Sequence, residues 1–200
     1  MQATTAVNQY REQTGHWTRM TGWLNTAKNK TLTDWTVEQL DVQPYQHILE
    51  ISYGSGYTLS EVARKLKIGF LAGVEESVDA YRKAYTRNKK LIAEDLLQLH
   101  IGSIHDIAYP SHYFHTIYGT NIHGDCKTAS LYFMKLSRLL KTGGMLVIVF
   151  QPAWASSDTE VRLAAEKIMG ELLEAGLVGV EVAYKDMHPV TGIAVTGYKS

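Results

Sequence analysis

Two acidic residues flank a glycine turn in this chain, and together they form the pattern best suited to hold a ligand. The segment from His47 to Leu59 reads HILEISYGSGYTL, in which an apolar run reaches Glu50 and then breaks into small residues. Glycine there permits positive φ angles and close approach of the backbone to a ligand. An amphipathic helix follows at once, and its N-terminal N–H groups and positive dipole end face the same place. The pattern predicts a site for a nucleotide-like cofactor.

The second acid, Glu75, stands about twenty residues beyond the turn, at the end of the next predicted strand. In Rossmann-type folds an acid at this position accepts hydrogen bonds from the ribose hydroxyls of a bound cofactor. A glycine motif alone has little specificity, and such a turn can also serve only to join a strand tightly to a helix. The turn and the acid at this spacing, within alternating elements, are more specific and favour the cofactor site.

Apolar periodicity predicts that strands and helices alternate after Pro44. A helix is also expected in the polar lead before this proline, and the segment 104–113 has little helical character. The predicted strands are 47–52, 70–75, 97–102, 114–120, 145–150, 178–184 and 192–198, and the predicted helices after Pro44 are 57–66, 78–94, 127–140 and 159–175.

This alternation predicts an α/β fold, with a parallel sheet and helices on both of its faces. The last two predicted strands are joined by a connection too short for a parallel crossover, so the last strand is expected to be antiparallel. The segment from Lys141 to Gly144 places a cation and glycines where the C-cap of the helix 127–140 is expected.

Size and composition predict one soluble domain of 200 residues. Lys plus Arg and Asp plus Glu number 20 each, so no global field favours nucleic acid or an acidic membrane surface. The single cysteine, Cys126, excludes an intramolecular disulfide and fits a reducing compartment. No signal peptide and no run long enough to span a bilayer are visible, so a cytoplasmic protein is expected.

Histidine is the residue type to weigh as a general base near neutral pH. His112, His115 and His123 lie around the predicted strand 114–120, and His123 follows Asn121 at the carboxyl end of that strand. His123 is therefore the candidate base, and the alternative is a histidine at the surface or the core edge. His112 and His115 have an H-x-x-H spacing, but no Cys or carboxylate cluster joins them, so no metal site is expected.

These segments resemble a small class I S-adenosylmethionine-dependent methyltransferase. LEISYGSG (49–56) resembles the family motif L-[DE]-x-G-x-G-x-G, and GVEES (73–77) resembles the second-strand motif with its ribose-binding acid. LKTGGMLVIVF (140–150) is similar to the stretch that leads into the fifth strand. The resemblance covers the chain from about Gln43 onward, and more weakly the lead, where TGWLNTAKNKTL is similar to the helical lid of small bacterial members.

The resemblance implies a Rossmann-like three-layer sandwich with a seven-stranded, mostly parallel sheet in the strand order three-two-one-four-five-seven-six, ending in an antiparallel strand. It implies one domain over residues 1–200, in which 1–42 form an N-terminal helical lid and 43–200 the core. Aromatic residues could close such a lid over an apolar acceptor, and packing against the sheet is the alternative for each of them: Tyr10, Trp17, Trp23 and Trp154.

The resemblance also implies S-adenosylmethionine as the cofactor and a small molecule as the methyl acceptor, with no nucleic acid or membrane partner. Balanced charge agrees, because phosphate neutralisation requires clustered Lys and Arg. Carried over by position, the cofactor residues are Glu50, Ser52, Tyr53, Gly54 and Gly56 around the methionine part, Glu75 and Glu76 at the ribose and adenosine, Ser103 and Ile104 at the adenine, and Thr120 and Asn121 on the pocket floor.

Two positions depart from the family pattern. Ser52 stands where the first glycine of the motif is expected, and Ser103 stands where many members carry an aspartate that accepts from the adenine amino group. A hydroxyl accepts that bond without charge, and charge-assisted bonds are about twice as strong. A cofactor-binding protein that has lost catalysis is therefore one alternative. An NAD-dependent oxidoreductase is another, although its third small residue is replaced by Leu59.

Overall fold

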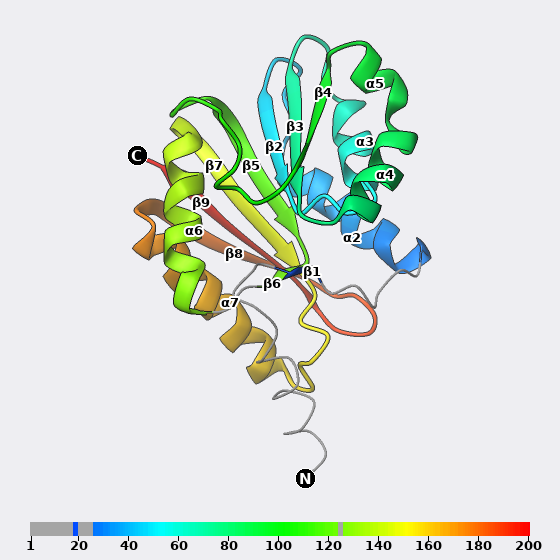
Figure 1. Cartoon of the computed structure of the whole chain (residues 1–200). Helices are drawn as coiled ribbons and strands as arrows, with labels where there is room; N and C mark the ends of the chain where they lie inside the picture. The colour runs from blue at the N-terminus through cyan, green and yellow to red at the C-terminus, as the bar shows by residue number, and fades with distance from the viewer. Residues whose placement is uncertain (1–17, 20–25, 124–125) are drawn as a thin grey trace.

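The computed structural model describes residues 18–19, 26–123 and 126–200, and these residues form a sheet covered by helices on both faces (Figure 1). The sheet has seven strands in the order β4-β3-β2-β5-β7-β9-β8. The strands are β2 (His47–Ile51), β3 (Phe70–Glu75), β4 (Leu97–Ile101), β5 (Phe114–Thr120), β7 (Leu140–Phe150), β8 (Leu177–Lys185) and β9 (Gly192–Lys199).

The strand order confirms the predicted fold class. Counted along the chain, the seven strands of this sheet lie in the order three-two-one-four-five-seven-six. Strands β2, β3, β4, β5 and β7 pair in parallel, whereas β9 pairs antiparallel with both β7 and β8. All five parallel strands therefore end at one edge of the sheet, here called the carboxyl edge, and begin at the opposite amino edge.

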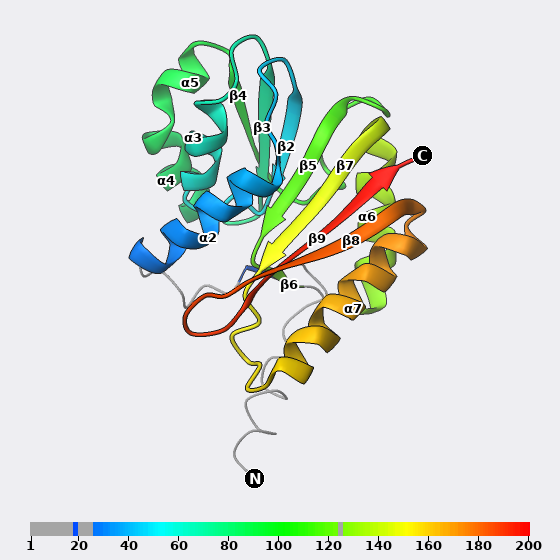
Figure 2. The same cartoon turned by 180° about the vertical axis from the view of Figure 1, so that it is seen from behind.

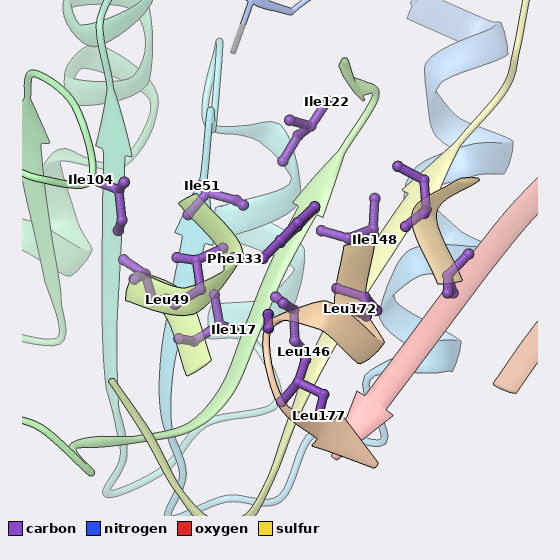
Figure 3. Packing of buried hydrophobic residues seen from close by; sticks show 14 of the residues in the cluster. Leu49, Ile51, Ile104, Ile117, Ile122, Phe133, Leu146, Ile148, Leu172 and Leu177 are labelled. Carbon is purple, nitrogen blue, oxygen red and sulfur yellow. The ribbon is translucent and has the colours of Figure 1, made fainter. Parts of the chain in front are cut away.

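The helices that precede β4 in the chain cover one face of the sheet, and the later helices cover the other (Figure 2). One face carries α2 (Thr26–Gln39), α3 (Tyr57–Ala63), α4 (Val78–Arg87) and α5 (Lys89–Ala93), and the other carries α6 (Cys126–Leu139) and α7 (Asp158–Glu174). Side chains alternate between the faces because the strand period is two. In β7, Val147 and Val149 belong to the core cluster under α2 and α3, whereas Leu146 and Ile148 belong to the cluster under α6 and α7. Figure 3 shows this second cluster, with Phe133 of α6 against the strands.

Two sequence-based boundaries are wrong for reasons of tertiary contact. The predicted helix 78–94 is divided at Asn88, whose φ of −111° leaves the helical region and whose side chain bonds outside the helix. The predicted C-cap at Lys141–Gly144 lies within β7 instead, because Leu140 already pairs with Phe114. Gly144 is required there, since a Cβ would stand 2.9 Å from the carbonyl oxygen of His115.

The lead reaches the carboxyl edge of the sheet through β1 (Thr18–Arg19), which pairs antiparallel with β6 (Ile122–His123) just after β5. The described part of the predicted lid helix is α2, which buries Leu32 and Trp35 against the sheet. Tyr10, Trp17 and Trp23 lie outside the described residues, so the lid and its boundary at residue 42 stay predictions. None of the helices in the described ranges has the length and apolar character that a bilayer crossing requires.

Candidate functional site

The turn after β2 lies at the carboxyl edge and is built from left-handed residues. Ser52, Gly54 and Gly56 have φ values of 54°, 53° and 68°. The N–H of Ser52 donates to the carbonyl oxygen of Val74 at 2.8 Å, which fixes the turn to β3. A serine in this conformation costs about 1–2 kcal/mol that glycine would not cost. Strain of this kind is held in place by its surroundings and is common at ligand sites.

Glu75 fastens the glycine turn to the loop after β3. Its carboxylate accepts from the N–H of Gly54 at 2.8 Å through one oxygen, and from the N–H of Ser77 at 3.0 Å through the other. An ionised carboxylate offers about four acceptor sites. The two backbone bonds therefore orient the carboxylate and leave room for about two further donors, such as vicinal hydroxyls.

Gly56 is required by packing within the protein. A Cβ at this position would lie 2.7 Å from Nδ2 of Asn88 and 2.8 Å from Cβ of Ala84, both contributed by the end of α4. Nδ2 of Asn88 donates to the Gly56 carbonyl at 3.1 Å, and Nε of Arg87 donates to the Ser55 carbonyl at 3.1 Å. Gly56 therefore serves to join the strand tightly to the helix. Ser52 and Gly54 are the turn residues that remain for close approach of a ligand.

Two predicted residues lie beneath the turn. Glu50 is fully buried, and the hydroxyl of Tyr118 donates to its Oε2 at 2.8 Å. The side chain of Tyr53 is also buried, and its hydroxyl donates to the carbonyl of His100 at 3.2 Å. Burial, followed by the charge of Glu75, raises the pKa of Tyr53. Tyr53 can therefore offer a ligand only its backbone.

The residues predicted at the nucleoside end converge on one small hollow. It is lined by Ser52, Val74, Glu75, Glu76, Gly102, Ser103, Ile104 and Tyr132. Its volume of about 10 Å³ holds no more than about one water molecule. A nucleoside fits these residues chemically, but its ring system does not fit the hollow unless a lining side chain moves, and Tyr132 is the largest of them.

Tyr132 was not predicted from the sequence. It comes from α6, next to the buried Phe133, and the two rings meet edge to face with centroids 6.0 Å apart. Burial, followed by the charges of Glu76 and Glu75, raises the pKa of Tyr132. The only sequence signal was an aromatic residue one position off the buried stripe of its helix.

An acidic residue, Asp106, lies beside Ser103, although Ser103 itself occupies the position where many members of the family carry an aspartate. The N–H of Ser103 donates to Oδ2 of Asp106 at 2.7 Å, and the hydroxyl of Ser103 accepts from the N–H of His105 at 3.1 Å. The hydrogen bonds of Asp106 with Ser103, first with its backbone N–H and then with its side chain, lower the pKa of the exposed Asp106. The loop therefore carries a charged acceptor three residues after the position where the sequence lacks one.

The predicted floor residues bind the ends of several strands together. Thr120 is buried, and Asn121 has a φ of 52°. Oδ1 of Asn121 accepts from the N–H of Gln151 at 3.0 Å, and Nε2 of Gln151 donates to the carbonyl of Val190 at 2.7 Å. Gln151, which the sequence did not single out, thus ties β5 and β7 to the loop between β8 and β9.

The three histidines considered in the sequence analysis lie at two different edges of the sheet. His123 belongs to β6 at the carboxyl edge, and its side chain lies outside the described residues, so its role stays a prediction. His112 and His115 lie at the amino edge, where Nδ1 of His115 accepts from the N–H of His47 at 2.9 Å. Among the described residues, no three His, Cys, Asp or Glu side chains gather as a metal site would require. Trp154 is 57% exposed in the segment after β7.

Comparison with known proteins shows that the chain is similar to methyltransferases. A family model described as a methyltransferase domain matches residues 49–148, from the third residue of β2 into β7. The uncharacterized methyltransferase YdaC of Bacillus subtilis (strain 168) is 26% identical over 179 residues, which cover 89% of this chain and 97% of that protein.

Solved structures share the fold at low sequence identity. The S-adenosylmethionine-dependent methyltransferase SibL, in its apo form, is similar with a TM-score of 0.68 and 13% identity, over 86% of this chain and 55% of that one. The geranyl diphosphate C-methyltransferase of Streptomyces coelicolor, in complex with S-adenosyl-L-homocysteine, is similar with a TM-score of 0.64 and 13% identity, over 86% and 81%. A phosphoethanolamine N-methyltransferase of Haemonchus contortus has a TM-score of 0.62 and 12% identity, over 84% and 52%.

Proposed function

This chain belongs to the methyltransferase domain family, and we propose that its β2–α3 turn binds S-adenosylmethionine for methyl transfer to a small molecule. The observation that carries the assignment of residues is the carboxylate of Glu75. Two backbone N–H groups hold it at the end of β3, beside the turn, with acceptor sites left for ribose hydroxyls.

The other residues take roles that follow from their positions. Ser52 and Gly54 present the backbone and hydroxyl groups closest to the methionine part, and Glu50 supports the turn from below. Ser103 and Asp106 offer acceptors to the adenine amino group. Glu76 and Ile104 flank the nucleoside, while Thr120 and Asn121 form the floor.

The cofactor supplies a methyl group that its positive sulfur already activates. The chain has therefore to position the acceptor in line with that methyl group and to exclude water. A base is needed only for an acceptor that must lose a proton, and His123 is the proposed base in that case. The lead paired to β6 and the segment around Trp154 lie at the edge where an acceptor would enter.

We propose that the methyl acceptor is a small molecule and that the protein acts in the cytoplasm. The chain has equal numbers of acidic and basic residues, so it lacks a strong field for polyanions. Two of the similar structures are named for small substrates, geranyl diphosphate and phosphoethanolamine. Ser52 and Ser103, which depart from the family pattern, motivate a second candidate, a cofactor-binding protein that has lost catalysis.

Calorimetry tests the proposal directly. S-adenosylmethionine and its demethylated product are titrated into the wild type and Glu75→Gln, with NAD as the control ligand. We expect binding of both sulfur ligands, weaker binding by the variant and none of NAD. Binding without turnover on any of a panel of small acceptors favours the second candidate, and absence of binding contradicts both.

A further inference from the structure

A second hollow lies at the amino edge, away from the proposed cofactor site. Its volume is about 390 Å³, within the range of about 300–1,000 Å³ that small-molecule sites have. The walls come from the end of α2 and the segment after it, the starts of β5 and β7, and the end of β9. The lining residues that the argument uses are Asp41, His115, Lys141, Gly143 and Gly144.

The hydrogen bonds of His115 fix the place of its proton. Nδ1 accepts from the backbone N–H of His47 at 2.9 Å, so Nδ1 carries a lone pair. In a neutral imidazole the proton then resides on Nε2, which becomes a donor. Burial, followed by the charges of Lys141 and His47, lowers the pKa of His115 from 6.5, so the ring is neutral at pH 7.

The neighbour of this donor is a second donor. Nζ of Lys141 lies 3.0 Å from Nε2 of His115. A lysine ammonium has three donors and no acceptor, so the two groups cannot form a hydrogen bond with each other. Within the described part of the chain, Lys141 forms no ion pair with a carboxylate. Among the described residues, no protein oxygen accepts a hydrogen bond from Nζ of Lys141 or from Nε2 of His115.

We propose that this hollow binds an oxyanion, carried by a small phosphorylated or carboxylated molecule, between Lys141 and His115. An oxyanion accepts from both donors at once, and charge-assisted bonds of this kind are about twice as strong as neutral ones. Gly143 has open space where a Cβ would stand, so the backbone beside the pair can be approached closely. Asp41 lines the same hollow and opposes an anion, which limits the affinity.

The test follows the two side chains in the wild-type protein by NMR. Inorganic phosphate or acetate is titrated in at pH 7, at constant ionic strength maintained with sodium chloride. We expect saturable shifts of the NMR signals of the His115 ring and of Lys141 Nζ. The pKa of His115 should rise in the presence of the anion that binds. Tighter binding of phosphate than of acetate assigns the site to a phosphorylated molecule, and the reverse assigns it to a carboxylate.

Matched variants locate the binding. Lys141→Gln should weaken it about tenfold, by loss of a charge-assisted contact, and Asp41→Asn should tighten it about two- to threefold. Lys89→Gln removes an exposed charge on α5 and should change nothing. Shifts no larger than those from sodium chloride alone overturn the proposal. So does a neutral Lys141 amine at pH 7, because that amine would itself accept the proton of Nε2.

Discussion

The two edges of the parallel sheet differ in how their polar groups are paired. At the carboxyl edge, Glu75 holds Gly54 and Ser77, and Asn121 holds Gln151. At the amino edge, His115 and Lys141 turn donors toward each other. The first edge keeps acceptor capacity on a carboxylate that is already oriented, whereas the second places two donors together without an acceptor between them.

This difference shows which edge the fold has organised in advance. The loops after parallel strands converge at the carboxyl edge, which is where ligands bind in open α/β sheets. There the left-handed turn, the acid and the strand ends hold one another without a ligand. The amino-edge hollow beside His115 and Lys141 places two donors together without an acceptor between them, so a ligand there would complete a contact rather than enter a prepared network.

The largest effect is expected where the glycine turn packs against α4. Gly56→Ala places a Cβ against Asn88 and Ala84 at a φ of 68°, so overpacking and left-handed strain add. We expect the free energy of unfolding to fall by about 4 kcal/mol in chemical denaturation. Gly170→Ala is the matched control, since nothing lies within 4 Å of its Cβ and the helix α7 should gain about 1 kcal/mol. Equal stability of the two variants would mean that the turn is not locked by α4.

The next effect concerns the acid at the carboxyl edge. Glu75→Ala removes the acceptor of two backbone N–H groups and of the ribose hydroxyls, so cofactor binding should weaken by about 3 kcal/mol in calorimetry. Glu166→Ala, which removes an exposed acid on α7, is the control and should bind as the wild type does. Unchanged affinity in a folded Glu75→Ala protein would show that the ribose lies elsewhere.

Ser52→Gly separates strain from binding. Glycine accepts the φ of 54° at no cost, so the free energy of unfolding should rise by about 1 kcal/mol. Cofactor binding should nevertheless weaken by about 2 kcal/mol, because the hydroxyl is expected to donate to the methionine carboxylate. Tighter binding by Ser52→Gly would contradict that donor role. A wild type that binds nothing, with binding created by Ser52→Gly together with Ser103→Asp, would show that the site has lapsed.

Tyr132→Ala tests whether the nucleoside hollow must open. If the ring has to leave before the ligand enters, its removal should tighten cofactor binding about three- to tenfold, since no closed state is left to compete. Tyr85→Ala removes an exposed tyrosine of α4 and serves as the control in the same titration. Weaker binding by Tyr132→Ala would instead mean that the ring stacks on the bound nucleoside.

Local signals explain how much of the fold and the site could be predicted. The bounds of β3 and β5 agree with prediction, because glycine or polar segments bound each strand in the sequence itself. The order of the strands came from the family resemblance and not from periodicity. The break at Asn88 depends on a bond to the Gly56 carbonyl, which no local pattern contains.

The same limit applies at the candidate site. The glycine turn and Glu75 could be found because only one short helix, one turn and one strand separate them along the chain, and the structure joins them by a 2.8 Å bond. Tyr132 and Gln151 reach the edge from α6 and from the end of β7, so only tertiary packing brings them there. Whether the cofactor contacts all the predicted residues stays a prediction.

The smallest effect is the pH dependence of the amino edge. Burial, followed by the charge of Lys141, lowers the pKa of His47 and of His115 below 6.5. The unfolded chain therefore binds these protons more readily, so the stabilising contribution is complete above about pH 6.5 and is lost as the pH falls through the lower folded-state values. The free energy of unfolding should therefore fall as the pH falls below about 6.5.

His115→Asn keeps an acceptor for the N–H of His47 while removing one titrating ring, so the pH slope should become shallower. Burial also lowers the pKa of His100 in β4, so this residue contributes to the pH slope. Because His100 is present in both proteins, its contribution is the same in each. An oxyanion bound at Lys141 would favour the charged imidazole, so phosphate should flatten the slope of the wild type and leave that of His115→Asn unchanged. A slope that His115→Asn does not alter would mean that the amino edge carries none of the pH dependence, and the contrast between the two edges would then rest on geometry alone.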